Sequence, residues 1–337
     1  MSFREYLGGK GVWVDGLCWS SYSQSAGNLS EIDYIDAQEP ATLYIHERYG
    51  RFGNNIHQLL NSLVIARALS LKIIDCKFYI DEERTKSIFI DDMVINFGIN
   101  GPPRAPYISA TMFYVQGFEK FIADFSYDTV KRDAEKLYRA LFAPKITEKY
   151  DANRNVVVFH FRSGDIFSTD INPLYTQPPL SYYVKALDHI CETITGADLR
   201  VVYENKLNPC IDKFCNVLDE RGLKYKTQSS SFKADAGLLA SADCVVSSYS
   251  SFCDALALMN DNLKRWYAFR AAAAFECVDL SISSKFSSIL QSIGAEIYLV
   301  DDEEGLYIPM GGWKNTPEQI RQLTDYPTSK LCIKPLQ

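Results

Sequence analysis

"NVVVFHFRSGDIF", residues 155 to 167, decides the class of fold. Its first half is a continuous apolar run, which is typical of a strand buried on both faces of a parallel sheet. A loop that contains glycine follows, and a helical pattern then covers residues 180 to 196. Strand, loop and helix in this order form the repeating unit of an α/β fold.

The same unit recurs downstream. Further strand patterns cover residues 199 to 205, 244 to 250 and 264 to 269, and helical patterns lie near residues 208 to 222, 233 to 241 and 250 to 260. Alternation of strands and helices over this length predicts a doubly wound parallel sheet. Ligands of such sheets bind beyond the carboxyl ends of the strands.

A second α/β pattern lies upstream. Residues 41 to 47 and 71 to 80 read as strands, and apolar side chains recur at helical spacing between them, which predicts a βαβ-like unit. Residues 126 to 142 have the charge alternation of a surface helix, and a polar stretch suited to a linker follows. We therefore expect an N-terminal domain over residues 1–145, a second domain over residues 146–310 and a C-terminal tail over residues 311–337.

The composition limits the classes of function. With 337 residues, of which 47% are hydrophobic, the chain can bury a large core and is long enough for two domains. Lys and Arg number 35 against 42 Asp and Glu, so the formal net charge is −7. This charge argues against nucleic acid as a partner, although a local basic pocket can bind a small anion.

The sequence also predicts a location. Its N-terminus lacks the apolar core of a signal peptide, and no run of 18 uninterrupted apolar residues occurs. The nine cysteines are odd in number and scattered, which favours a reducing compartment. We expect a soluble, cytoplasmic protein without a structural metal.

The loop after the strand at 155 carries a candidate anion site. His160 and Arg162 lie on one face of the strand end, Gly164 permits close approach of the backbone, and Asp165 can pin the loop. Arg is well shaped for bidentate contact with phosphate. A salt bridge between Arg162 and Asp165 across a tight turn would explain the same residues, and the spacing favours neither interpretation.

Two other stretches offer phosphate-compatible donors. In "SSYSSFCDALALMN", a strand ends at Ser247 and Ser248 and a helix begins near Ser250 or Ser251, so exposed amides and hydroxyls could hold a phosphate. Ordinary N-capping by serine is the alternative. The third stretch, "GRFGNN" at residues 50 to 55, is a positively charged and amide-rich turn before a helix.

Together, the three stretches resemble the superfamily of GDP-fucose-dependent fucosyltransferases, which covers α1,2-, α1,6- and protein O-fucosyltransferases. "GRFGNNIHQLLNSLVIARAL" is similar to the family's opening turn and helix, "HFRSGD" to its H-x-R-x-G-D motif, and "VVSSYSSFCDALA" to its S-x-S-S-F-S region. The motifs occur in the family's order over roughly residues 43 to 260. The resemblance implies a GT-B type fold, with two Rossmann-like domains that face a cleft. It also implies metal-independent, inverting transfer of fucose from GDP-fucose to a carbohydrate hydroxyl in glycan or surface polysaccharide synthesis.

The resemblance assigns roles to residues of the second domain. Arg162 would contact the donor phosphates, and His160 would lie beside the nucleotide or sugar. Asp235 would help to hold the base or ribose. The residues that would close around the pyrophosphate are Ser250, Ser251 and Phe252.

In the N-terminal domain, the resemblance places Arg51, Gly53 and Asn54 near the transferred sugar. The base that would deprotonate the acceptor is not identified by the sequence, and the candidates are His57, Glu47, Asp165 and His160. No D-x-D pair stands at a strand end, and the Asp pairs at 91 and 301 lie in surface-like sequence. We therefore expect no metal and no cofactor, with basic side chains and helix-terminal amides stabilising the departing diphosphate.

Two positions depart from the family pattern. Ser163 stands where many α1,2- and α1,6-enzymes have a second Arg, and Asn55 replaces the usual Gln. Two alternatives therefore stay open, namely transfer from another sugar nucleotide and a non-catalytic sugar-nucleotide-binding protein of a polysaccharide assembly complex. The expected partners are a nucleotide sugar and a glycan acceptor, and a lipid-linked acceptor would bring peripheral association with a membrane.

Overall fold

The structure of the protein is a computed structural model. It describes residues 42–80, 84–101, 103, 107–110, 126–141, 155–168, 177–229, 231–271, 290–291, 294–302, 307 and 313–336. The chain divides into two compact units. Unit 1 comprises Met1–Pro144 with Asp279–Ile289, and unit 2 comprises Lys145–Val278 with Leu290–Gln337. The N-terminal segment and the linker stretch considered above lie outside the described residues.

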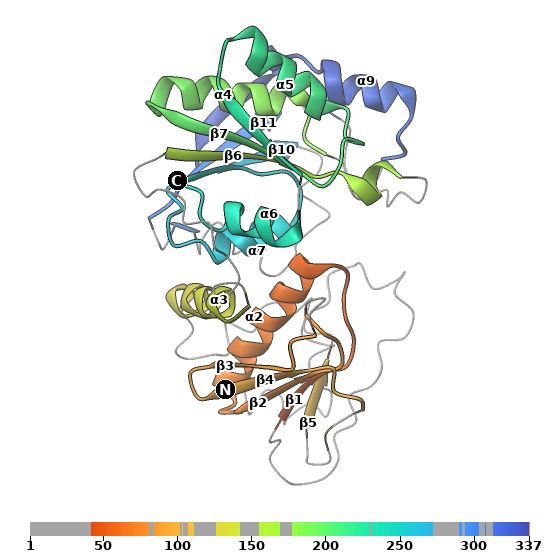
Figure 1. Ribbon diagram of the computed structural model, residues 1–337, viewed down its shortest axis with the longest axis vertical. Coiled ribbons are helices and arrows are strands. Elements are labelled where there is room, and N and C mark those ends of the chain that lie inside the picture. Colours follow the sequence, from red (N-terminus) through yellow and green to blue (C-terminus); the bar gives the residue numbers. More distant parts are fainter. Residues whose placement is uncertain are drawn as a thin grey trace. The chain divides into compact units, whose positions relative to one another are not determined.

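Unit 1 is an α/β unit with a mainly parallel sheet (Figure 1). The strand order is β3-β4-β2-β1-β5, and only β3 runs antiparallel to its neighbour. The strands are β1 (Thr42–Ile45), β2 (Ile73–Cys76), β3 (Ser87–Ile90), β4 (Met93–Phe97) and β5 (Tyr107–Ala110). The expected βαβ-like unit is present as β1, α2 and β2.

Two helices complete the described part of unit 1. Helix α2 (Phe52–Ala68) buries Ile56, Leu59 and Leu63, whose spacing of three and four residues places them on one face. Helix α3 (Tyr127–Leu141) contacts both α2 and β3. The predicted helix is therefore present, and two of its charged residues, Lys131 and Asp133, are buried.

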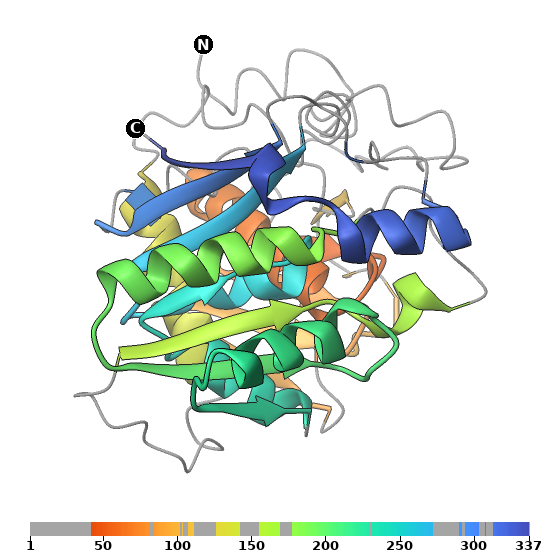
Figure 2. The ribbon, with the colours of Figure 1, turned by 90° about the horizontal axis from the view of Figure 1, so that it is seen from above.

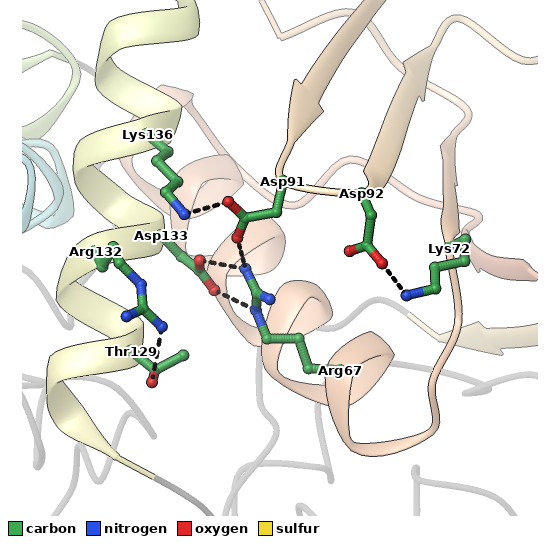
Figure 3. Close-up of polar contacts among 8 residues, drawn as sticks. All are labelled: Arg67, Lys72, Asp91, Asp92, Thr129, Arg132, Asp133 and Lys136. Atoms are coloured by element: carbon green, nitrogen blue, oxygen red, sulfur yellow. Dashed lines mark hydrogen bonds and ion pairs between the residues drawn. The ribbon is translucent and has the colours of Figure 1, made fainter.

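An ion-pair network joins the elements of unit 1 (Figure 3). Arg67 of α2 donates Nε and Nη2 to the two carboxylate oxygens of Asp133 of α3, at 3.0 and 2.7 Å. Its Nη2 also lies 2.8 Å from Asp91 in the β3–β4 turn, and Lys136 contacts the same carboxylate. Asp133 is only 1% exposed, so this bidentate pair is the buried part of the network.

Unit 2 contains the predicted doubly wound sheet. The strand order is β12-β11-β10-β9-β6-β7-β8, and all neighbours are parallel except β12, which is antiparallel to β11. The strands are β6 (Asn155–Phe161), β7 (Ala197–Tyr203), β8 (Tyr225–Gln228), β9 (Cys244–Val246), β10 (Arg265–Ala271), β11 (Glu296–Asp302) and β12 (Leu331–Pro335). Residues 156 to 161 of β6 are buried, as the apolar run predicts.

Helices cover both faces of this sheet. Figures 1 and 2 show α4 (Leu180–Thr193), α5 (Cys210–Glu220) and α9 (Pro317–Asp325) on one face. Helices α6 (Phe232–Leu239) and α7 (Ser251–Leu258) contact each other on the other face (Figure 1). Because β6 leads to α4 and the adjacent β9 leads to α7, the chain changes face between these two strands. This is the switch point at which doubly wound sheets bind ligands.

The expected C-terminal tail is wrong as a description of residues 311–337. Residues 317–325 form α9, which begins with a capping box between Thr316 and Gln319. Residues 331–335 form β12, which pairs with β11 from Tyr298 to Asp302. The segment is therefore an edge of the sheet of unit 2.

Candidate functional site

The site begins at the carboxyl ends of β6 and β9. His160, the penultimate residue of β6, is 6% exposed, and its Nδ1 lies 2.8 Å from Oγ of Ser248. Burial, together with the positive charge of Arg162, lowers the pKa of His160 to about 3. The imidazole is therefore neutral at physiological pH, and it ties the two strand ends together across the switch point.

Arg162 leaves β6 and points toward the loop after β9. Its Nη1 donates to the carbonyl oxygen of Tyr249 at 3.2 Å, and its Nη2 lies 3.6 Å from a carboxylate oxygen of Asp165. The side chain of Arg162 is 15% exposed, whereas that of Asp165 is 49% exposed. The salt bridge that the sequence allowed is thus present but loose, and the guanidinium is held mainly against the loop that follows β9.

The turn after Arg162 is fixed by two asparagines that sequence reasoning missed. Ser163, which is 1% exposed, donates to Oδ1 of Asn205 at 2.7 Å and accepts from the backbone N–H of Asn208 at 3.0 Å. Nδ2 of Asn208 donates to the carbonyl oxygen of Arg162 at 2.9 Å. A buried hydroxyl with two partners explains why a small polar residue occupies this position.

Gly164 is needed at this turn for its backbone conformation. Its φ is +74°, and a Cβ would lie 2.5 Å from a carboxylate oxygen of Glu204. A residue with a side chain would be strained in this region of φ. Glycine at position 164 thus allows the sharp turn that follows Arg162.

Helix α7 begins without a side-chain cap. Ser250 is its N-cap residue, yet no side-chain hydrogen bond caps the helix there. In contrast, Ser231 caps α6 by accepting from the backbone N–H of Ala234 at 3.2 Å. Ordinary N-capping therefore does not account for Ser250. Ser250 and Ser251 lie half-buried at a helix start whose amides and positive dipole end suit an anion.

Asp254 is a second residue that sequence reasoning did not single out. It lies three residues after Ser251 and four after Ser250, so the three side chains share one face of the first turn of α7. Its half-buried carboxyl group has a pKa raised to about 7 by burial. A protonated carboxyl group can donate a hydrogen bond to a phosphate oxygen, whereas an ionised one would repel it. The sequence feature that could have indicated Asp254 is an acidic residue in the first turn of a helix.

Two further candidate donor-binding residues lie on helices α6 and α7. Asp235 of α6 is half-buried, and its Oδ1 accepts from Nε2 of Gln228 at 2.9 Å. The ring of Phe252 lies 6.1 Å from that of His160, measured between centroids. Unit 2 thus brings together His160, Arg162 and Asp165 with Ser250, Ser251 and Phe252, around the ends of β6 and β9.

The acidic pair at 301 is not surface-like, so that expectation was wrong. Asp301 and Asp302 end β11 and are 4% and 1% exposed. Arg270 at the end of β10 contacts both carboxylate oxygens of Asp301. Asp302 accepts from the backbone N–H of Tyr307 and from the hydroxyl of Tyr326, each at 2.7 Å. Both carboxylates are therefore used in contacts that hold β10, β11 and the neighbouring segments together.

The remaining candidates belong to unit 1. Arg51 is the exposed N-cap residue of α2, and no side chain caps the helix there. Gly53 is buried, and the half-buried Asn54 lies against Gly50, where a Cβ would clash with its Nδ2. Gly50 has φ +62°, which explains the glycine before the turn.

Asn55 and Gln58 hold the chain that leads into α2. Both are fully buried. Asn55 donates from Nδ2 to the carbonyl oxygen of Tyr49 at 2.9 Å and accepts from Nε of Arg48 at 2.9 Å. Gln58 donates from Nε2 to the carbonyl oxygen of Glu47 at 3.0 Å and accepts from the backbone N–H of Tyr49. The amide-rich part of the turn is thus structural at Asn55.

The candidate proton acceptors have different surroundings. His57 is 7% exposed within α2, whereas Glu47 is exposed in the loop before it. His160 is a weak base because of its low pKa. Within the described residues, no group of three or more His, Cys, Asp and Glu side chains could hold a metal ion.

We compared the chain with known proteins. No family model matches the sequence, and no curated protein sequence matches it either. A solved structure named "OtsA apo structure" is similar at 10% sequence identity and a TM-score of 0.26, over 75% of this chain and 63% of that chain. The chain thus spans less than two thirds of the length of that structure. In the part of the chain that the structure describes, no helix is both long and apolar enough to cross a membrane.

Proposed function

We propose that this protein is a glycosyltransferase that takes a sugar from a nucleoside diphosphate sugar, GDP-fucose in the first instance, and transfers it to a carbohydrate hydroxyl. The observation that carries the proposal is the hydrogen bond of 2.8 Å between His160 and Ser248. It joins the two loops of the family-like motifs at the switch point of a doubly wound sheet, where ligands of such sheets bind.

The donor diphosphate would bind between Arg162 and the start of α7. Arg162 supplies a positive charge that is already oriented by the carbonyl oxygen of Tyr249. Ser250 and Ser251 supply hydroxyls beside the amides of the first turn. A neutral His160 adds no charge of its own and keeps these two loops at a fixed separation.

The reaction would invert the anomeric carbon. The oxygen of the acceptor hydroxyl attacks this carbon, the bond from the carbon to the phosphate oxygen breaks, and the diphosphate leaves with the bonding electron pair. A base takes the hydroxyl proton. Arg162 and the amides of α7 would stabilise the negative charge on the leaving diphosphate, a task that a divalent metal performs in other transferases.

The role proposed for unit 1 rests only on the resemblance to the fucosyltransferase superfamily. Arg51, Gly53 and Asn54 are proposed to contact the transferred sugar. Glu47, His57 and Asp165 remain the candidates for the base, since His160 is too weakly basic. The acceptor would be a glycan made in the cytoplasm, and a lipid-linked one would hold the enzyme at a membrane surface.

A thermal unfolding experiment tests the proposal. The purified protein is heated with GDP, UDP or CMP in the presence of EDTA, and a ligand that binds only the folded state raises the unfolding temperature. Stabilisation by GDP, followed by release of fucose from GDP-fucose, supports the proposal. Stabilisation by UDP or CMP alone would be compatible with sugar transfer but would exclude GDP-fucose as the donor. No stabilisation by any of the three would contradict nucleotide binding.

A matched pair of variants makes the result specific. Arg162→Ala should reduce the rise in unfolding temperature that GDP causes. The control is Arg221→Ala, which removes the ion pair between Arg221, at the end of α5, and Asp188. GDP should stabilise this variant as it does the unmodified protein.

A further inference from the structure

A row of aromatic rings runs outward from the site just described. The ring of the buried His160 lies 6.1 Å from that of Phe252, which lies 5.4 Å from that of Phe232. The three residues come from β6, α7 and α6. Phe232 is 43% exposed, so part of this residue faces solvent.

Two exposed large apolar residues follow the last two strands at this end of the strand order. Phe232 follows β8, and Leu207, which is 54% exposed, follows the adjacent strand β7. The strands lead to helices on opposite faces, because α5 follows β7 and α6 follows β8 (Figure 1). Phe232 and Leu207 therefore stand at the carboxyl ends of neighbouring strands, on the two sides of one sheet edge.

The distance between these residues and the switch point is comparable to the length of a nucleotide. Strands β9, β6, β7 and β8 are neighbours in that order. Adjacent strands lie about 4.8 Å apart, so the β7–β8 end is about 10 Å from the β6–β9 switch point. A ligand whose diphosphate lies at the switch point would thus extend its other end toward Leu207 and Phe232.

We infer that the exposed ring of Phe232, supported from behind by Phe252, is a stacking surface for the nucleobase of the donor. A nucleobase has two flat apolar faces and a polar edge. Aromatic side chains bind such faces regardless of the identity of the base. The polar edge can be read by Asp235, because it lies three residues after Phe232 on the same face of α6 and its carboxylate is oriented by Gln228.

The inference rests on the proposed function, since it names the part of the nucleotide that lies at this end of the site. It adds a binding residue that none of the three motifs contains. It also separates two contributions to affinity. Arg162 would act on the diphosphate of every ligand, whereas Phe232 would act only on ligands that carry a base.

The test compares Phe232→Ala with Phe232→Trp in the full chain. By titration calorimetry, Phe232→Ala should weaken GDP binding about tenfold, which is within the range for loss of one base–aromatic contact. Phe232→Trp should bind GDP at least as well as the unmodified chain. GDP, but not inorganic pyrophosphate, should quench the fluorescence of the indole that Phe232→Trp introduces. Phe89→Ala removes a 73% exposed ring in unit 1 and should leave GDP binding unchanged.

Three results would count against the inference, and they can be distinguished from one another. If GDP binds through Arg162 and Phe232→Ala does not weaken it, the stacking surface is wrong and the proposed function stands. If the unmodified chain binds no nucleotide, both fail together. Equal quenching of the introduced indole by pyrophosphate and by GDP would also count against stacking, since pyrophosphate has no base.

Discussion

Nδ1 of His160 and Oγ of Ser248 lie 2.8 Å apart and are both buried, 88 positions apart in the chain. They join β6 to the loop after β9, as does the hydrogen bond from Arg162 to the carbonyl oxygen of Tyr249, so these two bonds help to set the geometry of the phosphate-compatible donors. Removal of the hydroxyl by Ser248→Ala would leave a buried ring nitrogen without this partner. We expect a loss of about 1–3 kcal/mol in the free energy of unfolding, measured by urea denaturation.

The same variant should weaken GDP binding, because the two loops lose one of the two hydrogen bonds that join them. A control is Ser241→Ala, which removes a hydroxyl bonded to the carbonyl oxygen of Gly237 within α6. Ser241→Ala should leave GDP affinity unchanged. Equal GDP affinities in all three proteins would show that the bond does not position the site.

The pKa of Asp254 predicts how stability depends on pH. Burial raises the pKa of this carboxyl group from 3.8 to about 7 in the folded state. The folded protein therefore holds the proton more tightly than the unfolded chain, so stability is lost as pH rises from about 4 to about 7. Asp254→Asn cannot ionise and should raise the unfolding temperature at pH 8 by about 2–4 °C, with a smaller effect at pH 5. A greater gain at pH 5 than at pH 8 would reverse the sign and refute the assignment.

Unit 1 contains both a strong and a weak ion pair. Asp133 is buried and binds Arg67 through both oxygens, so Asp133→Ala removes the buried partner of Arg67, leaves only the more exposed Asp91 beside it, and should cost about 3 kcal/mol. Lys72 and Asp92 are 58% and 64% exposed, and Lys72→Ala should cost less than about 1 kcal/mol. Urea denaturation of both variants checks this order. Similar costs for the two would show that burial does not decide the strength of these pairs.

The structural role of Ser163 can be tested directly. The variant Ser163→Arg would place a long charged side chain at a residue that is 1% exposed and whose hydroxyl is bonded to Asn205 and to the backbone of Asn208. We expect a loss of about 1–3 kcal/mol from overpacking and from the unpaired polar groups. A variant of wild-type stability with tighter GDP binding would mean that the turn can accept the arginine.

The fold of unit 2 could be predicted where single segments carry the information. Apolar stretches marked β6, β7 and β10 within about two residues, because a parallel strand covered on both faces is mostly apolar along its length. Strand β9 was expected to be longer, but the chain turns at Ser247 toward the uncapped start of α7. Helix α9 was missed although Thr316, Pro317 and Gln319 form the signature of a capping box.

The site was less accessible from sequence. The loops of His160 and Ser248 could be recognised by their residue types, but the bond between them depends on strand order, which no local pattern encodes. The hydrogen bonds of Asn205 and Asn208 depend on strand order as well. Both residues follow β7, and they fix the turn after the neighbouring strand β6. The exposed ring of Phe232 has no signal in the sequence, because only its exposure beside Phe252 distinguishes it from a core residue.

Titration of GDP into the unmodified protein, Arg162→Ala and Arg221→Ala, with EDTA present, tests the phosphate-binding role of Arg162 most directly. Arg162→Ala should lose about 1.5–3 kcal/mol of binding free energy, the range for a hydrogen bond to a charged group, and Arg221→Ala should lose none. Equal GDP affinity in all three proteins would contradict a donor site at the ends of β6 and β9.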